Sequence, residues 1–415
     1  MQFFTDKRLL LISHHNSYRI APYIKAAKKL GLEVTIASQG KHSLVSEVAN
    51  GVHIDFNNAA TSIEQILQEH KNRPFNGILG SDDQTVELAA LIAETLNLPH
   101  NPPEAAKYSH RKDLARAQLA LAGCPVPIHC LLDLTLPLDR QIKGLPWPCV
   151  LKPVNMSASR GVIRVNNEGE FLNACERLRP ILATAVDEFE QNHLLIEDYI
   201  GGVEIAYEGY LVNGELNTVT IFDKPDPLTG PYFAETIYVT PSALDDAIQL
   251  SVKDVIQRAC TAYGLRTGAI HAECRIDSNN TVWILEIASR TIGGDCGQML
   301  ANDNFSVEEL AISLAINHPI ETDIPEQARG VMMIPIEEKG LLKRVEGLLE
   351  ARKIAHIEKV DIVIREGHEL TPLPEGNQYL GYIFASADTP EAVTDALRQA
   401  HAQLKFVVAK VFAIT

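Results

Sequence analysis

The sequence predicts a parallel α/β fold at the N-terminus, followed by a larger α+β region. In the first hundred residues, short apolar runs alternate with helical stretches, which is the pattern of a parallel sheet covered by helices. Beyond position 105, apolar runs follow one another across short turns such as Asn213-Gly214, which is typical of antiparallel strands. The chain has 415 residues, enough for more than one hydrophobic core.

The N-terminal region contains apolar runs that we expect to form the parallel strands, at 8–13, 32–38, 52–56 and 76–83. The helix after the first run ends at Gly31, a residue favoured just past the last helical turn. Ligands of such sheets bind where the strands end. Candidates for such a site follow two of the strands, at residues 14–19 and at Ser81, Asp82 and Asp83. For Ser81 and the two aspartates, a role as helix caps is an equally good explanation. No G-x-G-x-x-G motif follows the first strand, which argues against a dinucleotide site.

The segment 101–103 interrupts this pattern and is expected to end the first domain. Further along the chain, helical periodicity predicts helices at 109–122, 168–186, 243–263, 306–317 and 390–404. Strand-like runs lie between them, at 147–154, 156–165, 194–200, 204–216, 218–222, 268–277, 281–290, 331–336, 356–364 and 379–387. The runs 268–277 and 281–290 are separated by three turn residues and therefore predict a hairpin.

Composition excludes several classes of protein. The formal net charge is −16, which argues against nucleic-acid binding through a basic surface, although a small anionic ligand needs only a local group of donors. No apolar run is long enough for a membrane helix, and the first twelve residues do not resemble a signal peptide. The seven cysteines are widely spaced without a C-x-x-C pair, so we expect reduced thiols, no structural zinc and a cytoplasmic location.

Three features of the α+β region suit a phosphorylated ligand. Lys152 follows three apolar residues in a strand, where the alternative is an edge strand with a snorkelling side chain. The segment 156–162 is small and contains a glycine, so its N–H groups can approach phosphate oxygens; a plain hairpin turn explains it equally well. The segment 196–204 offers backbone groups for a base and the carboxylates of Glu197 and Glu204 for ribose hydroxyls, unless these are surface residues around a loop.

The most specific feature is the pair Glu273 and Glu286, thirteen residues apart on the two arms of the predicted hairpin. With a turn of ordinary length, both side chains point to the same side of the sheet. Two such carboxylates repel unless a cation lies between them, and Mg²⁺ held by carboxylates and substrate phosphates fits this arrangement. Arg290 supplies a cation for phosphate or carboxylate four residues after Glu286. A surface salt-bridge cluster is the alternative.

The order of these residues resembles that of the ATP-grasp superfamily, in which the matching positions here are Lys112, Lys152, the Ser/Gly loop, Glu197, Glu204, Glu273, Glu286 and Arg290. The segments 221–244 and 286–297 and the motif PLPEGNQYLGYIFA are similar to L-amino acid ligases and biotin-carboxylase-like ligases. The resemblance implies a three-domain ATP-grasp architecture. A preATP-grasp parallel α/β domain covers 1–104, a central ATP-grasp nucleotide and metal domain covers 105–325, and a small mixed C-terminal domain covers 326–415.

The resemblance also implies roles for individual residues. The residues it assigns to ATP are Lys112 and Lys152 at the phosphates, Ser157, Ser159 and Gly161 in the loop above them, Glu197, Tyr199 and Ile200 at the adenine, and Glu204 at the ribose. Those it assigns to the chemistry are Glu273 and Glu286 as ligands of Mg²⁺ or alternatively Mn²⁺, Arg290 as the stabiliser of the intermediates, and Gly293 and Gly294 beside the carboxylate substrate. Glu235, His271 and Asp295 are candidates for the general base.

The implied activity is an ATP-dependent ligase that joins a carboxylate to an amine through an acyl phosphate, with small-molecule substrates and a homodimeric state. Two positions depart from the family pattern. Ala288 stands where many members carry an Asn, and Tyr238 stands where dipeptide-forming members commonly carry a His. Two alternatives stay open, a biotin-carboxylase-type enzyme and an ATP-binding sensor without turnover. Against the carboxylase, this sequence has no Met-Lys-Met biotin site, so a biotinylated partner would be needed. Gly294 also stands about where the carboxylase branch has a Glu.

Overall fold

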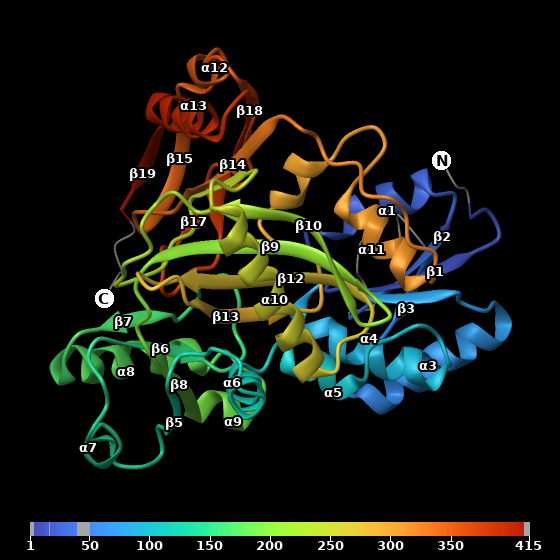
Figure 1. Ribbon diagram of the computed structural model, residues 1–415, viewed down its shortest axis with the longest axis horizontal. Helices are drawn as coiled ribbons and strands as arrows, with labels where there is room; N and C mark the ends of the chain where they lie inside the picture. The colour runs from blue at the N-terminus through green and yellow to red at the C-terminus, as the bar shows by residue number, and fades with distance from the viewer. Residues whose placement is uncertain (1–3, 16, 40–49, 411–415) are drawn as a thin grey trace.

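The computed structural model describes residues 4–15, 17–39 and 50–410, so Asn16 of the first strand–helix junction lies outside the described residues. Figure 1 shows the N-terminal unit in blue on the right, a small sheet unit at the lower left and the C-terminal unit in orange and red at the top. A long antiparallel sheet lies between them. This arrangement confirms the predicted combination of a parallel α/β unit with antiparallel α+β units.

The N-terminal unit is a four-stranded parallel sheet with strand order β3-β2-β1-β4. Its elements are β1 (Arg8–Ile12), α1 (Ile20–Lys29), β2 (Glu33–Ser38), β3 (Asn50–His53), α3 (Ala59–Asn72), β4 (Gly77–Gly80) and α4 (Asp83–Thr95). Leu9 and Leu11 belong to the core under α1, whereas Leu10 and Ile12 belong to the core under α4, as the alternation of a strand requires. β4 is shorter than predicted, because Asp83 already begins α4.

The small sheet unit has strand order β5-β8-β6-β7, and its neighbouring strands are antiparallel. Two helices, α5 (Pro103–Tyr108) and α6 (Lys112–Leu121), precede it. Its elements are β5 (His129–Asp133), α7 (Leu138–Gln141), β6 (Cys149–Pro153), β7 (Ile163–Val165), α8 (Glu168–Leu182), α9 (Glu188–Asn192) and β8 (His193–Asp198). Phe171 and Leu178 of α8 share a core with Leu151 and Ile196 of the sheet. The Ser/Gly loop connects β6 to β7 at the edge of this sheet.

The central sheet has eight antiparallel strands in the order β13-β12-β9-β10-β11-β14-β18-β16. They are β9 (Val203–Val212), β10 (Glu215–Asp223), β11 (Ile237–Thr240), β12 (Gly268–Ile276), β13 (Val282–Ala288), β14 (Ala328–Pro335), β16 (Ile357–Ile362) and β18 (Tyr379–Ala387). Because β11 pairs with β14, the sheet continues across the predicted division at 325/326. The C-terminal unit therefore shares a sheet with the central one.

The remaining elements cover this sheet or extend it. Two helices, α10 (Asp246–Tyr263) and α13 (Pro390–Gln403), pack on its strands, and a three-stranded sheet in the order β17-β15-β19 lies beside the C-terminal end. The strands of that small sheet are β15 (Gly340–Glu346), β17 (Glu369–Leu370) and β19 (Lys405–Ala409). The other helices are a 3₁₀ turn η1 (Cys296–Leu300), α11 (Val307–Ala315) and α12 (Leu348–Ala351).

Helix α11 ties the N-terminal unit to the centre of the molecule. Its residues Ala311 and Ile312 share a core with Leu9 of β1, and Figure 1 shows this orange helix beside the blue unit. The contact is close, because a Cβ at Gly77 of β4 would lie 2.5 Å from the carbonyl oxygen of Ala315. Helix α11 is therefore packed directly on the N-terminal sheet.

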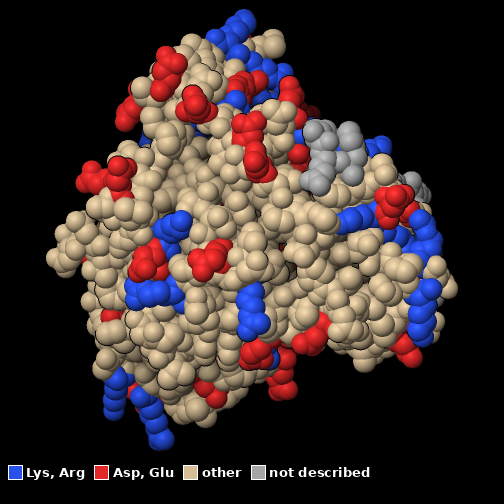
Figure 2. All heavy atoms as spheres, turned by 45° about the vertical axis from the view of Figure 1, so that its right-hand side comes forward, with Lys and Arg blue, Asp and Glu red and all other residues tan. Residues whose placement is uncertain are grey.

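The cysteines, the helices and the surface charges bear on the expectations from composition. All seven cysteines are free, and six of them are buried. Among the described residues, no helix combines the length and the apolar character needed to cross a membrane. On the face shown in Figure 2, basic and acidic side chains lie next to one another in small groups.

Candidate active site

One cavity of about 620 Å³ receives side chains from all the units of the molecule. The N-terminal unit contributes residues 17–19 and 82–84, and the C-terminal unit contributes Met333, Asn377 and Tyr379. The central and small sheets provide the rest. Every residue to which the resemblance assigns a role lines this cavity except Gly161 and Asp295. The structure thus brings together residues that are up to 182 positions apart in the chain, from Lys112 to Gly294. Of the strand-end candidates, His14, residues 17–19, Asp82 and Asp83 also line it, whereas His15 and Ser81 do not.

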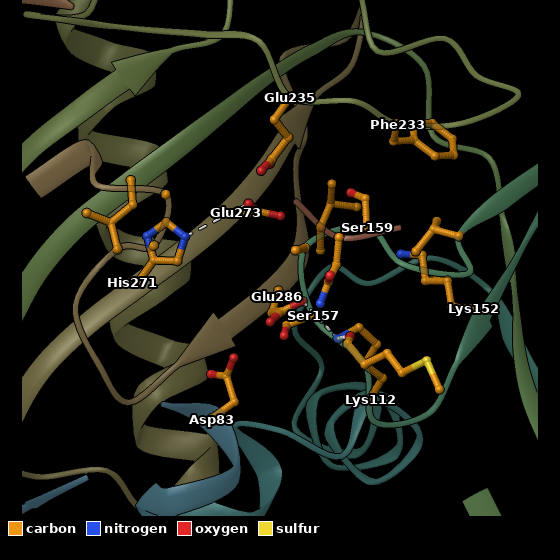
Figure 3. A pocket seen from close by; sticks show the side chains of 18 of the residues that line it. Asp83, Lys112, Lys152, Ser157, Ser159, Phe233, Glu235, His271, Glu273 and Glu286 are labelled. Atoms are coloured by element: carbon orange, nitrogen blue, oxygen red, sulfur yellow. Dashed lines mark hydrogen bonds and ion pairs between the residues drawn. The ribbon is translucent and has the colours of Figure 1, made fainter. Parts of the chain in front are cut away.

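Two lysines approach the cavity from the side of the small sheet. Lys112 begins α6, and its Nζ lies 3.0 Å from the carbonyl oxygen of Met156 and 3.1 Å from Oε2 of Glu286. Lys152 comes from β6, with Nζ 2.5 Å from Oε2 of Glu197. Figure 3 shows both ammonium groups close to the loop that carries Ser157 and Ser159. Two cations beside a loop of small residues suit the phosphates of a nucleotide.

The carboxylate of Glu197 is bound on both oxygens, which corrects its expected role at the adenine. Arg116 of α6 donates to Oε1 and Lys152 donates to Oε2, and Glu197 is only 2% exposed. Burial would raise the pKa of Glu197, but Arg116 and Lys152 hold it at about 2. Glu197 therefore positions Lys152. The backbone N–H of Tyr199 donates to the carbonyl oxygen of Pro148 at 3.2 Å, so contact of an adenine with Tyr199 and Ile200 stays a prediction. Arg116 was not singled out from the sequence, because an arginine in an amphipathic helix normally faces solvent.

Glu273 and Glu286 are direct partners across the β12–β13 hairpin, as the spacing predicted. Glu273 also belongs to a second group, since one oxygen from each of Glu204, Glu235 and Glu273 lies within 4.8 Å of the others. The Nζ of Lys224 donates to all three, at 2.9 Å, 2.5 Å and 3.2 Å respectively. Figure 3 shows the carboxylates of Glu235 and Glu273 pointing toward one another at one side of the cavity.

Glu204 belongs to this acidic cluster, and its oxygens are bound by Lys224 and by Nε of Arg275 at 2.8 Å. Its side chain still lines the cavity, so its contact with ribose hydroxyls stays a prediction. Lys224 was not predicted, although it lies within the stretch 221–244 that resembles the ligases. Lys224, Arg275 and His271 together face these three carboxylates, so the cluster already contains its own cations. Carboxylate oxygens are nevertheless the ligands that a hard cation such as Mg²⁺ or Mn²⁺ prefers.

Protonation differs among the members of this cluster. Burial alone would lower the pKa of Lys224, but the three carboxylates raise it well above its usual value. Burial raises the pKa of Glu235 to about 7, while Lys224 opposes the shift and Glu273 adds to it. Burial opposes ionisation of Glu273 as well, but Lys224 and His271 keep its pKa well below the usual range. Glu235 is thus the carboxylate of the cluster that takes up a proton near neutral pH.

His271 lies between two carboxylates, which favours its protonated form and argues against its expected role as general base. Its Nδ1 lies 3.3 Å from Oε2 of Glu208, and its Nε2 lies 3.9 Å from Oε1 of Glu273. Burial would lower the pKa of His271, but these two carboxylates raise it to about 9. Glu208 is almost fully buried and also accepts the backbone N–H of Ile292 at 3.1 Å. The ion pair between His271 and Glu208 therefore connects β12 to the loop that follows Arg290.

That loop lies between the N-terminal and C-terminal units. The N–H of Gly294 donates to the hydroxyl of Tyr18 at 2.9 Å, and Gly294 has a φ of +61°. A Cβ at this position would lie 2.4 Å from Sδ of Met333, so a larger residue would require the Met333 side chain to move, and the left-handed backbone also favours glycine. At Gly293, a Cβ would lie 3.1 Å from a guanidinium nitrogen of Arg19. The two glycines are thus packed against both neighbouring units at the edge of the cavity.

Gly161 lies outside the cavity, which corrects its expected contact with the phosphates. Its N–H donates to the carbonyl oxygen of Pro374 at 2.9 Å, so this group is already used by the C-terminal unit. Gly161 has a φ of +73°, and a Cβ there would lie 2.6 Å from Cγ of Pro153. The glycine therefore shapes the Ser/Gly loop through close packing, and its neighbours Ser157 and Ser159 are the residues that line the cavity.

Replacing Gly161 by Ala is expected to weaken Mg·ATP binding by about tenfold and to lower the unfolding temperature. The left-handed backbone costs an L-residue about 1–2 kcal/mol, and crowding a packed site costs about 1–3 kcal/mol more. Isothermal titration and thermal unfolding measure the two effects. Gly144→Ala is the matched control, because Gly144 has a φ of +84° with no atom within 4 Å of a Cβ. Equal binding losses in both variants would contradict the packing role.

Three different parts of the chain match models of known protein families. The model of the ATP-grasp domain matches residues 145–299, and the model of the ATP-grasp N-terminal domain matches residues 24–100. The model of the L-amino acid ligase C-terminal domain 2 matches residues 332–409. The chain belongs to the ATP-grasp superfamily. In this ATP-grasp protein, the matched regions contribute most of the cavity lining described above.

Relatives of this ATP-grasp protein include named ligases. Alanine–anticapsin ligase of Bacillus subtilis is 25% identical over 246 residues, which cover 56% of this chain and 52% of that protein. Dapdiamide A synthase of Enterobacter agglomerans is 27% identical over 238 residues, which cover 56% of this chain and 54% of that protein. The matched region thus spans about half the length of these two ligases.

A solved structure shows the same fold over the whole chain. The crystal structure of L-amino acid ligase from Bacillus licheniformis superposes with a TM-score of 0.82 and 23% sequence identity. The superposition covers 98% of this chain and 100% of that one. This ATP-grasp protein therefore shares the fold of that ligase over nearly its whole length.

Proposed function

We propose that the protein is an ATP-dependent ligase that joins a small carboxylic acid, such as an amino acid, to an amine and releases ADP and phosphate. The observation that carries this proposal is one cavity lined by two lysines, the pair Glu273 and Glu286, and Arg290. Cations suit the phosphates, paired carboxylates suit a divalent metal, and an arginine suits a transferring phosphoryl group. The ligase relatives and the match to the L-amino acid ligase C-terminal domain support it.

In the first step, Lys112 and Lys152 would hold the ATP phosphates while a substrate carboxylate oxygen attacks the γ-phosphorus. The new C–O–P bond forms as the bond from the γ-phosphorus to the ADP oxygen breaks, which gives an acyl phosphate and ADP. Glu273 and Glu286 would hold Mg²⁺ or Mn²⁺, which supplies neutralisation of phosphate charge. Arg290 would donate hydrogen bonds to the phosphoryl oxygens.

In the second step, the amine would attack the acyl carbon, and the C–O bond to phosphate would break. The attacking nitrogen must lose a proton, and Glu235 is the candidate acceptor because its pKa of about 7 allows proton uptake at neutral pH. Closure by the Ser/Gly loop and by the C-terminal unit would keep water from hydrolysing the acyl phosphate. The division into domains at 104/105 and 325/326, the homodimer and the cytoplasmic location are further parts of the proposal, and they rest on family resemblance.

A substrate panel tests the proposed function. The wild-type protein is incubated with Mg·ATP and with carboxylic acids and amines, singly and in pairs, while ADP release is followed and products are identified by mass spectrometry. We expect ADP release to rise at least about tenfold with a matching pair, together with an amide product. ADP release that requires bicarbonate and biotin would instead indicate a carboxylase. Tight ATP binding without ADP release under every condition would indicate a sensor.

A further inference from the structure

Arg290 is held along one edge by a carboxylate from the N-terminal unit. Its Nε donates to Oδ1 of Asp83 at 2.5 Å, and its NH2 donates to Oδ2 at 2.7 Å, which is a two-bond fork. Its NH1 donates to the carbonyl oxygen of Thr291 at 2.9 Å. A guanidinium has five N–H donors, so these bonds use three of them and leave one on each terminal nitrogen.

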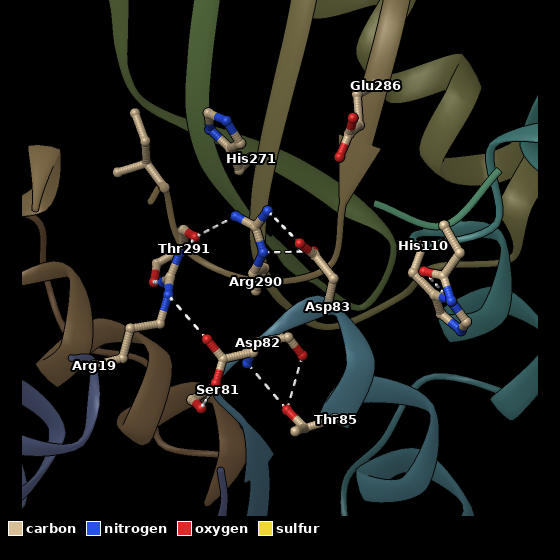
Figure 4. A network of polar contacts seen from close by, with 12 residues as sticks. Arg19, Ser81, Asp82, Asp83, Thr85, His110, His271, Glu286, Arg290 and Thr291 are labelled. Carbon is tan, nitrogen blue, oxygen red and sulfur yellow. Dashed lines mark hydrogen bonds and ion pairs between the residues drawn. The ribbon is translucent and has the colours of Figure 1, made fainter. Parts of the chain in front are cut away.

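The two remaining donors face the reacting part of the cavity. Figure 4 shows the terminal nitrogens of Arg290 directed to the side on which Glu286 and His271 lie, while Asp83 covers the edge that carries Nε. Arg290 and Asp83 both line the cavity. A guanidinium is planar, so fixing one edge also fixes the direction of the opposite donors.

Asp83 is itself held firmly. It is the first residue of α4, where the helix N-terminus favours a negative charge, and the preceding Asp82 forms a capping box with Thr85. Burial would raise the pKa of Asp83, but Arg290 and Arg19 outweigh it and lower the pKa, so the carboxylate is ionised. Asp83 was noted in the sequence only as a residue at a strand end, because a contact over 207 positions leaves no local signal.

A second contact fixes the same loop. Arg19 donates to the carbonyl oxygen of Thr291 at 3.2 Å and to its hydroxyl at 3.1 Å, and its Nε lies 3.6 Å from Oδ1 of Asp82. The carbonyl of Thr291 thus accepts hydrogen bonds from both arginines (Figure 4). Two acidic residues at the start of α4 therefore hold two arginines at the base of the glycine loop.

We propose that Asp83 is a positioning residue that acts through Arg290, holding the guanidinium so that only its two remaining terminal N–H donors reach the transferring phosphoryl group. The inference rests on the proposed function and adds a residue of the N-terminal unit to it. It also restricts the specificity of the site, because the Nε edge of Arg290 is closed to a substrate carboxylate. A substrate carboxylate bound by Arg290 would have to use the same two terminal donors.

Steady-state kinetics of Asp83→Asn tests this. We expect kcat to fall about 10²-fold, which is the usual effect of misplacing a reacting group by about 1 Å, while KM for Mg·ATP changes less than about threefold. Asp83→Glu should recover part of kcat. In the Arg290→Lys background, Asp83→Asn should have no further effect, because the group through which Asp83 acts is gone. Additive losses, or a normal kcat in Asp83→Asn, would overturn the proposal.

A binding measurement tests the same role without ligation. Fluoroaluminate bound together with Mg·ADP mimics the transferring phosphoryl group. We expect Asp83→Asn to weaken binding of Mg·ADP–fluoroaluminate at least about tenfold, a loss typical for a donor aimed at developing charge, and to leave Mg·ADP binding unchanged. Equal affinities of the wild-type protein and Asp83→Asn for the mimic would contradict the role of Asp83. This outcome does not depend on ligation. If the wild-type protein ligates no pair in the substrate panel, the proposed function fails, whatever the affinities for the mimic are.

The matched control is Glu33→Gln. Glu33 also accepts two bonds from one guanidinium, that of Arg73, but neither residue lines the cavity. This variant should keep the wild-type kcat and the wild-type affinity for the mimic. Thermal unfolding is measured for every variant, and Asp83→Ser replaces Asp83→Asn if the latter does not fold. Loss of activity in Glu33→Gln equal to that in Asp83→Asn would show a general structural effect and would also overturn the proposal.

Discussion

Replacing Glu286 by Gln is expected to reduce ATP turnover by at least about 10³-fold while leaving the fold intact. Glu286 is the register partner of Glu273 and lies 3.1 Å from Lys112. The amide keeps the shape and can still accept from Lys112, but it removes the negative charge that a divalent cation needs. Charge stabilisation by a bound metal contributes several kcal/mol, and about 4 kcal/mol corresponds to this factor. ADP release at saturating Mg·ATP measures the loss.

The fold should survive because the Glu286 side chain is 25% exposed and does not belong to a core. Glu215→Gln is the control, since Glu215 is an exposed residue at the start of β10 and does not line the cavity. Circular dichroism and thermal unfolding should be unchanged in both variants. If Glu286→Gln releases ADP at a near-normal rate, Glu286 is not a metal ligand.

The second large effect is expected for Arg290→Lys, which should lower kcat by about 10²–10³-fold and change ATP affinity only a few-fold. Lysine keeps the charge but loses the planar fork that binds Asp83 and the fixed direction of the other donors. Donors aimed at developing charge typically contribute about 10²–10³ in kcat. The lysines at the phosphates, Lys112 and Lys152, are not bonded to Arg290, so ground-state binding of ATP should be largely retained.

The measurements for Arg290→Lys are kcat from ADP release and the dissociation constant of Mg·ATP from titration calorimetry. Arg73→Lys is the control, because it removes the corresponding fork to Glu33 away from the cavity. Equal losses of turnover and of ATP affinity would mean that Arg290 binds the ground state, and its role at the transferring group would be wrong.

Much of the fold could be predicted from local patterns. The alternation in the first hundred residues predicted the parallel sheet, and the spacing of Glu273 and Glu286 predicted their pairing across a hairpin. The eight-stranded sheet could not be predicted, because β11 and β14 meet only after about ninety intervening residues. Neither strand carries a signal for the other, and the predicted division at 325/326 therefore falls inside one sheet.

In the candidate site, too, local motifs could be predicted and long-range contacts could not. Residues in recognisable motifs, such as Lys152 and Arg290, could be predicted to share one cavity. Their partners could not, since Arg116, Glu208 and Asp83 lie in helices or strands where a charged residue normally faces solvent. These partners decide what the motif residues can do, as the bonds that Glu197 makes to Arg116 and Lys152 show.

Transfer of ¹⁸O from the carboxylate substrate to phosphate is the most direct measurement of the central claim. A carboxylic acid identified in the substrate panel is labelled with ¹⁸O in its carboxyl group and is ligated to the amine with Mg·ATP. Attack of that carboxylate on the γ-phosphorus predicts one ¹⁸O atom in each released phosphate and one in each amide product, as mass spectrometry would detect. Phosphate without label, formed at the same rate as the amide, would contradict an acyl phosphate and with it the proposed mechanism of this site.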